Sequence, residues 1–531
     1  MTMPTSTPDA ATGEAGQAAV LSFLAGSGQP TVPAKRIDTH CSIVFLGPSR
    51  VLKIKRAIKL PYLDFSTLEK RRRACEDEIA INKRNAPAIY HRVVPITRGR
   101  DGLAIGGDGP VVEWAVEMAR FDENKTLDRL AEQNAIRPEL GERLAAILLE
   151  SHRTATRREG TPWLASLPVI IDRNTEQFCA EPVLSREEID RLHELSHRAL
   201  ARNLELLRGR AAAGQVRHCH GDAHLGNIVL LDGQPVLFDA IEFDSNIATT
   251  DVLYDLAFPL MDLLYFRRET VANRLFNSYM QTAWETQSGA LCLLPLFLSM
   301  RAAIRANVLF TKARQHQHDQ AIGAQARRYF ELARRLIEPG PPRLLAIGGK
   351  SGTGKSVLAR DMAHLIAPSP GALVLRSDVI RKQLYHVAEH ATLSPETYTP
   401  EASNRVYETM LKHAAHTLDQ GVSVILDAAF LKPVERGAAE AVARDAKVDF
   451  RGIFLTAGRA TRLHRVASRQ NDASDATSDV VLIQDNIETG MIDWDIVDAS
   501  GTPSTTLERS LSGLLASPTD GASGTSPKGN S

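Results

Sequence analysis

The sequence has no excess of charge of either sign, few cysteines and no long apolar run. Lysine plus arginine and aspartate plus glutamate each number 63 in 531 residues, so no overall basic field attracts nucleic acid or an anionic membrane. The five cysteines are scattered and none has C-x-x-C spacing, which argues against a disulfide framework or a zinc site and fits a reducing cytosol. Small or locally steered ligands are therefore the expected partners.

Membrane and export signals are also missing. The densest apolar run, residues 291–300, is too short to span a bilayer, and residues 1–8 lack the basic and apolar regions of a signal peptide. We expect a soluble cytoplasmic protein with no membrane partner. No pattern in the sequence indicates its oligomeric state.

Length and composition predict two domains between two polar tails. A chain of 531 residues exceeds one ordinary core. Both ends are rich in Ser, Thr, Gly, Pro and Ala and have too little apolar surface to fold, while Glu338-Pro-Gly-Pro-Pro342 is the sharpest internal break. The predicted parts are a disordered tail over 1–15, a first domain over 16–338, a linker over 339–342, a second domain over 343–500 and a disordered tail over 501–531.

The strongest motif opens the second domain. Gly349-Lys350-Ser351-Gly352-Thr353-Gly354-Lys355-Ser356 fits G-x-x-x-x-G-K-[ST], between a buried-strand pattern at 343–347 and a helical pattern at 356–366. Its glycines let backbone N–H groups turn toward phosphate oxygens, and the helix N-terminus adds partial positive charge. Lys355 would reach the β/γ-phosphates and Ser356 would hold Mg²⁺. The motif predicts an ATP site; the alternative is a glycine-rich turn that binds nothing.

The first domain begins with strand patterns and then turns helical. Residues 41–46 and 50–55 predict a hairpin whose second strand carries Val51, Lys53 and Lys55 on one face. Ser66-Thr-Leu-Glu69 predicts a capping box at the start of a helix that runs to about residue 85. Further strand patterns lie at 93–97, 103–105 and 111–118, and a second capping box lies at 185–188. The order is a small strand-rich lobe followed by a helical lobe.

A second informative stretch lies in the helical part. Asp222 and Asn227 stand on one loop, which is followed by a strand, a tight turn at Asp232-Gly233 and a returning strand that ends at Asp239. This order can gather three oxygen-bearing side chains around one point. Phosphoryl transfer needs such a group, because one carboxylate takes the acceptor proton while an amide and a second carboxylate hold Mg²⁺. The alternative is a polar hairpin in which these residues only cap turns.

At these residues the first domain resembles the aminoglycoside phosphotransferase and choline kinase branch of the protein-kinase-like fold. His220-Gly-Asp222-x-His224-x-x-Asn227 is similar to the catalytic loop of that group, with Gly where protein kinases usually have Arg. The resemblance implies Asp222 as the catalytic base and Asn227 and Asp239 as metal ligands. It also implies a strand lysine that contacts the α/β-phosphates and pairs with a helix glutamate.

Two lysines match that role. The pattern hydrophobic-x-Ile-Lys favours Lys55 and the pattern Val-Leu-Lys favours Lys53, so both remain candidates. Glu78 is the expected partner, with Glu76 and Asp77 as alternatives. The sequence departs from the family in one respect, because no G-x-G-x-x-G loop precedes the lysine strand.

The second domain resembles P-loop kinases of small molecules, such as gluconate and shikimate kinases, and the related zeta-toxin and polynucleotide kinase domains. Residues 374–381 are similar to their second strand and acceptor-binding segment, which implies that Asp378 orients or deprotonates the acceptor and that Arg381 holds an anionic group. Ser377-Asp378 would also serve as a helix N-cap. Residues 422–427 end a buried-strand pattern in a carboxylate, as in a Walker B segment, so Asp427 would contact Mg²⁺.

Three arginines follow the strand predicted at 450–455. Arg462, Arg465 and Arg469 are spaced i, i+3 and i+7, on one face of a helix. In the resembling families this segment is the lid, whose arginines close over the transferring phosphate. The resemblance therefore implies nucleotide binding by Arg462 and catalysis by Arg465 and Arg469. The alternative is a solvated basic face.

The predicted fold class is α/β and α+β in two domains. A bilobal protein-kinase-like fold precedes a three-layer α/β/α P-loop NTPase domain with a parallel sheet, a tandem similar to a group of bacterial predicted kinases. We predict an ATP- and Mg²⁺-dependent phosphotransferase that acts on a small-molecule hydroxyl acceptor. The alternatives are a regulatory protein in which one domain is a non-catalytic nucleotide sensor, and a nucleotide or polynucleotide kinase. Balanced charge argues against the nucleic-acid substrate.

Overall fold

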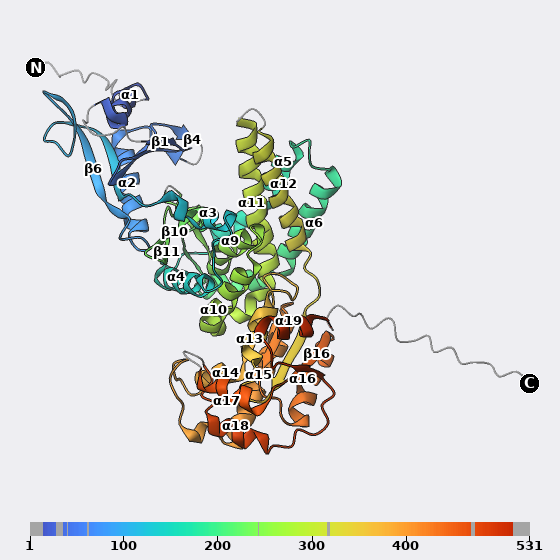
Figure 1. Cartoon of the computed structure of the whole chain (residues 1–531). Helices are drawn as coiled ribbons and strands as arrows, with labels where there is room; N and C mark the ends of the chain where they lie inside the picture. The colour runs from blue at the N-terminus through green and yellow to red at the C-terminus, as the bar shows by residue number, and fades with distance from the viewer. Residues whose placement is uncertain are drawn as a thin grey trace, which may run out of the picture. The chain divides into compact units, whose positions relative to one another are not determined.

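A computed structural model describes residues 14–27, 35–39, 41–60, 63–242, 244–315, 319–468 and 473–512. The chain forms two compact units, Met1–Val271 with Leu293–Glu338, and Ala272–Cys292 with Pro339–Ser531 (Figure 1). The change of unit after Glu338 coincides with the expected domain boundary. Residues 272–292, however, belong to the second unit, whereas the sequence placed them in the first.

The first unit begins with a six-stranded antiparallel sheet, in the order β1-β2-β3-β8-β6-β7. The strands are β1 (Lys35–Asp38), β2 (Ser42–Leu46), β3 (Arg50–Lys55), β6 (Tyr90–Gly99), β7 (Gly102–Ile105) and β8 (Val111–Ala119), with a separate pair β4 (Lys59–Leu60) and β5 (Leu63–Asp64). The helices of this lobe are α1 (Glu14–Ser22), the short turn η1 (Phe23–Ser27) and α2 (Leu68–Asn82).

Alternation along β3 gives the sheet two different faces. Leu52 and Ile54 join one apolar cluster, whereas Val51 joins a second cluster that includes residues of α2. Lys53 and Lys55 share the face of Val51, because side chains two residues apart in a strand point the same way. Both lysines therefore face α2.

The start of α2 differs from its prediction. Thr67, not Ser66, is the N-cap, and its hydroxyl accepts a hydrogen bond from the Lys70 N–H at 3.3 Å. The Ser66 hydroxyl instead donates to Asp64 at 2.6 Å, so the capping box predicted from Ser66 is wrong. The box predicted at Ser185 is present at the start of α6.

The helical lobe of the first unit is built around α9, α11 and α12, which pack on one another. Its helices are η2 (Glu123–Lys125), α3 (Leu127–Glu132), α4 (Leu140–Thr154), α5 (Thr161–Cys179), α6 (Arg186–Arg202), α7 (Leu204–Ala212), η3 (Leu225–Asn227), α8 (Ser245–Ala248), α9 (Val252–Tyr265), α11 (Leu294–Gln315) and α12 (Gln320–Ile337). Two antiparallel strand pairs complete it: β9 (Val216–His218) with β12 (Thr249–Asp251), and β10 (Ile228–Leu231) with β11 (Gln234–Leu237). The predicted order of a strand-rich lobe and a helical lobe is confirmed.

The second unit is a parallel sheet between two helical layers. Its strands follow the order β14-β15-β13-β16-β17, with α13 and α19 packed on one face and α15 and α16 on the other. The strands are β13 (Arg343–Gly349), β14 (Leu373–Arg376), β15 (Val424–Asp427), β16 (Asp449–Thr456) and β17 (Asp495–Asp498). The helices are α10 (Glu269–Gln287), η4 (Ser288–Leu293), α13 (Lys355–Ala363), α14 (Ser377–Leu384), η5 (Pro395–Tyr398), α15 (Pro400–Asp419), α16 (Pro433–Asp445), α17 (Arg459–Ala467), α18 (Ser478–Asp485) and α19 (Pro503–Ser512).

Two predictions about the tails change. Residues 503–512 form α19, and Leu507 and Leu511 pack on the apolar cluster beneath the parallel sheet, so this part of the expected disordered tail is folded. Glu14 and Ala15 lie in α1, also against expectation. The rest of both predicted tails lies outside the described residues.

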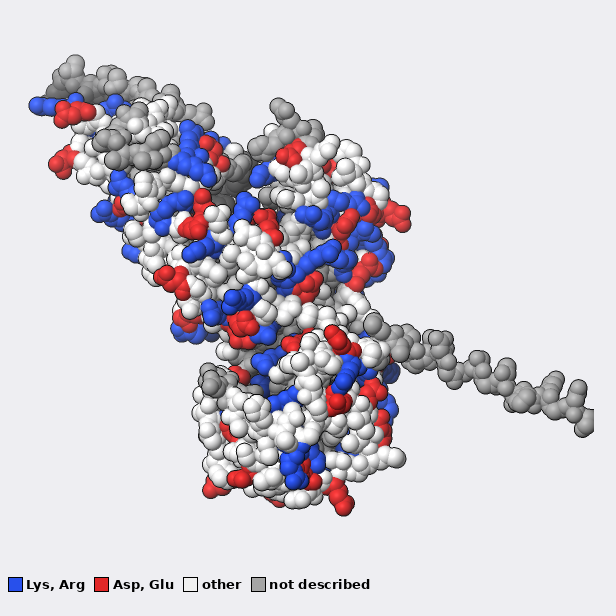
Figure 2. Space-filling view, in the orientation of Figure 1, with Lys and Arg blue, Asp and Glu red and all other residues white. Residues whose placement is uncertain are grey.

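The mixed charge agrees with the sequence analysis, whereas one apolar helical stretch is longer than the sequence analysis expected. Acidic and basic side chains are intermixed over the visible face of each unit (Figure 2). One stretch, Glu269–Gln315, is long and apolar enough by composition to cross a membrane, and 72% of its apolar window is buried in protein. Such burial is typical of core helices. The five cysteines are free thiols.

Helix α10 covers the edge strand of the parallel sheet. The Asn277 side chain accepts a hydrogen bond from the Val374 N–H at 2.7 Å and donates one to the Ala372 carbonyl at 3.1 Å. Asn273 donates to the same carbonyl at 3.0 Å. These amides satisfy backbone groups at the edge of β14 that no neighbouring strand pairs.

Asn277→Ala should destabilise the second unit by about 1–3 kcal/mol, because it leaves the Val374 N–H without its partner. Urea unfolding followed by circular dichroism measures the change. Gln281→Ala, one helical turn later, removes an exposed hydrogen bond to Glu389 and should change stability little. Equal losses in both variants would contradict the edge-covering role of Asn277.

Candidate active sites

The first candidate site lies where β3 faces α2. The Lys53 ammonium is 2.8 Å from Glu78 Oε1 and 2.6 Å from Asp239 Oδ1. Lys55 lies 2.7 Å from Glu78 Oε2 and pairs with Glu242. Glu78 thus bridges both lysines, as the sequence predicted for one of them. Glu76 and Asp77, the alternatives to Glu78, do not take this place: Glu76 pairs with Arg72 on the exposed side of the helix, and Asp77 is exposed.

Lys53 and Glu78 hold each other in the ionised state. Burial alone would lower the pKa of Lys53, but Asp239 and Glu78 raise it well above its ordinary value. Burial likewise opposes ionisation of Glu78, and the two lysines lower its pKa. Glu242 behaves differently, because burial raises its pKa despite the neighbouring Lys55.

The two lysines differ in what they can reach. Lys53 contacts Asp239, and 45% of the Asp239 side chain is exposed, so this pair opens toward solvent. Lys55 is fully buried between Glu78 and Glu242. Of the two lysines, only Lys53 thus pairs with a carboxylate that reaches solvent. Glu242 had no predicted role, although a carboxylate three residues after Asp239 is a visible signal.

The loop at 220–227 brings its predicted residues together. Asn227 donates to the Asp222 backbone carbonyl at 2.9 Å and to its carboxylate at 3.1 Å. The Asp222 side chain is 38% exposed, so the carboxylate remains accessible. Hairpin β10–β11 then returns the chain to Asp239, whose φ of +60° is rare for a residue other than glycine. The Asp239 N–H donates a hydrogen bond to the Tyr90 hydroxyl at 3.1 Å. Asn227 and Asp239 offer the oxygen ligands that Mg²⁺ prefers.

Two buried carboxylates of α9 fix this loop. Asp255 accepts from the Gly221 N–H at 2.8 Å, and Asp262 accepts from the Leu225 N–H at 3.0 Å. Burial would raise the pKa of Asp255, but the hydrogen bond from His152 and nearby cationic groups lower it to about 2. The sequence analysis missed both aspartates. Their signal is two acidic residues spaced i, i+7 in an otherwise apolar helix.

The second candidate site has the predicted strand, loop and helix. Strand β13 ends at Gly349, whose φ is +139° and where a side chain would lie 2.5 Å from the Leu455 carbonyl oxygen. Gly354, with φ +93°, precedes α13, which begins at Lys355. Only glycine suits these two positions, and the resulting loop turns its backbone toward the start of the helix.

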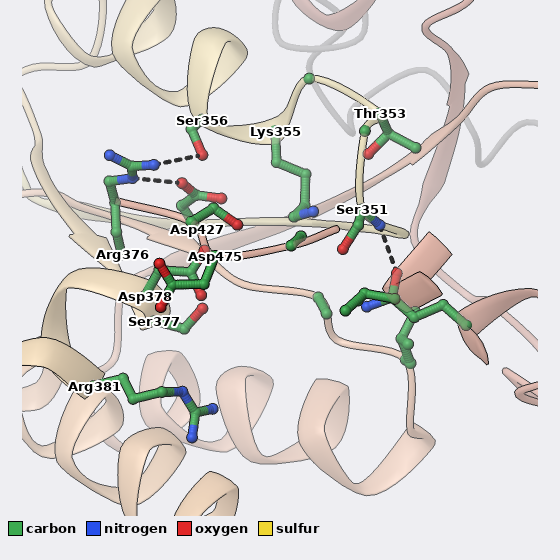
Figure 3. A pocket seen from close by; sticks show the side chains of 18 of the residues that line it. Ser351, Thr353, Lys355, Ser356, Arg376, Ser377, Asp378, Arg381, Asp427 and Asp475 are labelled. Carbon is green, nitrogen blue, oxygen red and sulfur yellow. Dashed lines mark hydrogen bonds and ion pairs between the residues drawn. The ribbon is translucent and has the colours of Figure 1, made fainter. Parts of the chain in front are cut away.

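This loop borders a cavity of about 710 Å³ (Figure 3). Ser351–Ser356 and Asp427 line it together with Asp378 and Arg381 of α14. Burial raises the pKa of Asp378, and the nearby Asp427 carboxylate adds to the rise. Residues predicted for phosphate binding and for acceptor binding thus border one space. The helix N-cap predicted at Ser377-Asp378 is wrong, because the N-cap of α14 is Arg376 and makes no side-chain cap bond.

Arg376 lies between the two predicted metal ligands of this site. Its guanidinium donates to Asp427 Oδ2 at 3.2 Å and to Ser356 Oγ at 3.2 Å (Figure 3). The oxygens of Ser356 and Asp427 therefore both lie within hydrogen-bond distance of one guanidinium, and they are of the kind that Mg²⁺ prefers. The sequence analysis gave Arg376 no role.

The lid arginines separate in the structure. Arg465 lines the cavity and donates to the Thr353 carbonyl at 3.4 Å. Arg462 is buried, pairs with Asp485 and does not line the cavity, and nucleotide binding by Arg462 stays a prediction. Arg469 lies outside the described residues. Spacing predicted that the arginines share one helical face. The partner of Arg462, Asp485, lies in a later helix, α18, which the spacing could not indicate.

Helix α18 also contacts the phosphate loop. The Gln484 side-chain oxygen accepts from the Ser351 N–H at 2.6 Å. Lys350 donates to the Asp485 carbonyl at 3.4 Å and does not line the cavity. A side-chain oxygen thus occupies one of the backbone donors that phosphate oxygens use in such loops.

Comparison with known proteins agrees with this division. Residues 62–286 match the model of the phosphotransferase enzyme family, and residues 344–485 match a model described as an AAA domain. The chain joins a phosphotransferase domain to a P-loop kinase domain. The phosphotransferase match extends into α10, which belongs to the second unit. Both matches support a phosphotransferase of the kinase type.

Relatives and solved structures resemble the whole chain or one of its domains. Uncharacterized proteins of Mycobacterium tuberculosis and Mycobacterium bovis are 27% identical over 87% of this chain and 92% of their own length. A choline/ethanolamine kinase family protein from Mesorhizobium loti covers 59% of this chain and 98% of its own at 14% identity and a TM-score of 0.36. A gluconokinase from Sinorhizobium meliloti covers 33% and 91% at 18% identity and a TM-score of 0.24.

Variants of the two lysines should have different effects. Lys55→Met leaves the buried Glu242 without its cation and should cost about 3 kcal/mol or more of stability. Lys53→Met should cost less, because Glu78 keeps Lys55 and Asp239 is exposed to water. Urea unfolding measures both. Glu242→Gln combined with Lys55→Met should recover part of the loss; equal losses in the two single variants would contradict the distinction.

Proposed function

We propose that the chain is an ATP- and Mg²⁺-dependent kinase that transfers a γ-phosphoryl group to a hydroxyl of a small-molecule acceptor in the cytoplasm. The observation that carries the proposal is the single cavity of about 710 Å³ that Lys355, Ser356 and Asp378 border together. Nucleotide phosphates and an acceptor hydroxyl can meet there, and a cavity of this size suits a small molecule.

The residues of the P-loop domain divide the work. Backbone N–H groups of the phosphate loop and Lys355 bind the phosphates, and Arg465 stabilises charge on the transferred group. Asp378 accepts the proton of the acceptor hydroxyl, for which its raised pKa makes it a stronger base. Ser356 and Asp427 would hold Mg²⁺, which would offset the negative charge of the phosphates.

The phosphotransferase domain carries a second set of groups for the same chemistry. Lys53 binds phosphate oxygens, Glu78 holds the lysine in place, and Asp222 accepts a proton from its own acceptor. Asn227 and Asp239 would hold Mg²⁺ in this domain. The buried hydrogen bonds that the loop of Asp222 donates to the α9 carboxylates fix its position.

A second candidate function is a nucleotide sensor in the phosphotransferase domain. It is favoured by the short turn at residues 47–49 between β2 and β3, where a glycine-rich loop would otherwise cover the phosphates. In that case the domain binds ATP without turnover and only the P-loop domain transfers phosphate. The two proposals differ in whether Asp222 is needed for phosphorylation.

Nucleotide binding by calorimetry tests the two sites separately. We expect two nucleotides per full-length chain, one in Lys355→Ala, one in Lys53→Met and none in the double variant. Lys412→Ala, which changes an exposed lysine of the same unit as Lys355, serves as the control and should keep both sites. Unchanged stoichiometry and affinity in Lys355→Ala would refute the P-loop site.

ATP consumption against sugars, aminoglycosides, amino alcohols and nucleosides identifies the acceptor. Asp222→Ala in the Lys355→Ala background should lose all remaining turnover if the phosphotransferase domain is catalytic. Full turnover in that double variant would exclude Asp222 as a catalytic base, and no turnover already in Lys355→Ala would favour the sensor.

The pH dependence of the P-loop site should show the environment of Asp378. Asp378 accepts a proton only as a carboxylate, so kcat/KM should fall as the pH drops through its pKa. Because burial raises that pKa, the fall should occur at a higher pH than the value of about 3.9 for an ordinary aspartate. Initial rates in the Lys53→Met background measure it. An acid limb at or below the ordinary aspartate value would contradict the assignment.

A further inference from the structure

The register of the parallel sheet puts Arg376 beside Asp427. The last residues of β14 and β15 are direct cross-strand partners, and they are these two residues. Both residues therefore lie at the carboxyl ends of the strands, next to the first turn of α13. There the guanidinium reaches Asp427 Oδ2 and Ser356 Oγ, both at 3.2 Å. The Arg376 side chain is 15% exposed, so the bridge is largely shielded from water.

A guanidinium at this point does part of what a divalent cation does. It offsets the Asp427 carboxylate and also favours the ionised form of Asp378, which Asp427 opposes. Without a cation there, the two carboxylates would repel each other in a poorly solvated space. Arg376 and a metal ion therefore use the same oxygens, and they cannot use them together.

We propose that Arg376 is a built-in competitor for the metal of the P-loop site. It holds Ser356 and Asp427 while the metal is absent, and it leaves them when the metal arrives with nucleotide. This inference rests on the proposed nucleotide site and adds an order of binding to it. A metal ion that binds alone must displace the guanidinium of Arg376. A metal ion that binds with nucleotide also brings phosphates, with which the displaced guanidinium can pair. The released guanidinium, a rigid fork of N–H donors, suits a phosphate oxygen as its new partner.

If Arg376 competes with the metal, a divalent cation should bind weakly in the absence of nucleotide, and Arg376 should be the cause of the low affinity. Removing a positive charge within contact distance should tighten binding of a divalent cation about tenfold or more. A misfolded variant would bind metal less tightly, so a gain in affinity cannot come from damage to the fold. The effect also needs no catalytic turnover and no knowledge of the acceptor.

Titration of the full-length chain with Mn²⁺ alone, followed by electron paramagnetic resonance of the free ion, tests the proposal. Arg376→Gln should bind Mn²⁺ about tenfold more tightly than wild type. Arg376→Lys, which keeps the charge, should stay near wild type. Arg360→Gln is the matched control. Arg360 is exposed, and it donates to the backbone oxygen of Ser356 rather than to the side-chain oxygen expected to bind the metal.

The gain must also map to the P-loop site. Adding Asp427→Asn to Arg376→Gln should abolish it, whereas metal sites elsewhere in the chain contribute equally to every variant. Equal Mn²⁺ affinity in wild type and Arg376→Gln, or a gain that survives Asp427→Asn, would overturn the proposal. Failure of ATP to bind the wild-type protein would instead overturn the proposed function. The Mn²⁺ titration does not involve ATP, so it would still test whether Arg376 competes with the metal.

A measurement on the wild-type protein covers the case in which Arg376→Gln does not fold. The Arg376 Nε–H, assigned by its loss in Arg376→Lys, should exchange slowly with water because it donates to Asp427. Saturating Mg²⁺ without nucleotide should accelerate this exchange in nuclear magnetic resonance spectra, because the Nε–H then loses Asp427 and no phosphate is present to accept it. Unchanged exchange on saturation would overturn the proposal.

Discussion

Buried charge that must be paired governs both candidate sites. In the phosphotransferase domain Glu78 lies between two lysines, and each lysine has a second carboxylate, Asp239 or Glu242. These contacts tie a strand, a helix and the loop after β11 to one another, because separating any pair would leave a charge in a poorly solvated interior. The P-loop domain meets the same requirement with Arg376 between Ser356 and Asp427. Placement of the reactive groups and stability of the fold thus depend on the same contacts.

Features encoded in a short stretch of sequence were predictable. The phosphate loop, hairpin β2–β3 and the order of Asp222, Asn227 and Asp239 each depend on residues close in the chain, and both fold classes are confirmed by the family matches. The capping box at Ser66 failed because Asp64, two residues earlier, takes the serine hydroxyl. Local patterns of this kind are decided by small energy differences between neighbouring partners.

Features that depend on distant partners were not predictable. Arg376 meets Asp427 through the register of two strands 51 residues apart along the chain, and Arg462 meets a carboxylate in a later helix. The different environments of Lys53 and Lys55 depend on Glu242, which lies 187 residues after Lys55 in the sequence. A single sequence gives the residue types at these sites and leaves their partners open.

The cover of α10 over the edge of β14 has a consequence for how such a protein can be assembled and exchanged. The second unit uses a segment that precedes the last helices of the first unit in the chain, so the two units interleave along the sequence. A single genetic crossover at the apparent boundary after Glu338 would transfer a P-loop domain without α10, so that the edge of β14 would be uncovered. The phosphotransferase domain left behind would keep α10, which it does not use. Exchange of the second unit alone would have to move residues 272–292 and the residues from 339 onward together, which takes crossovers before 272, after 292 and after 338. This requirement favours inheritance of the two units as one block.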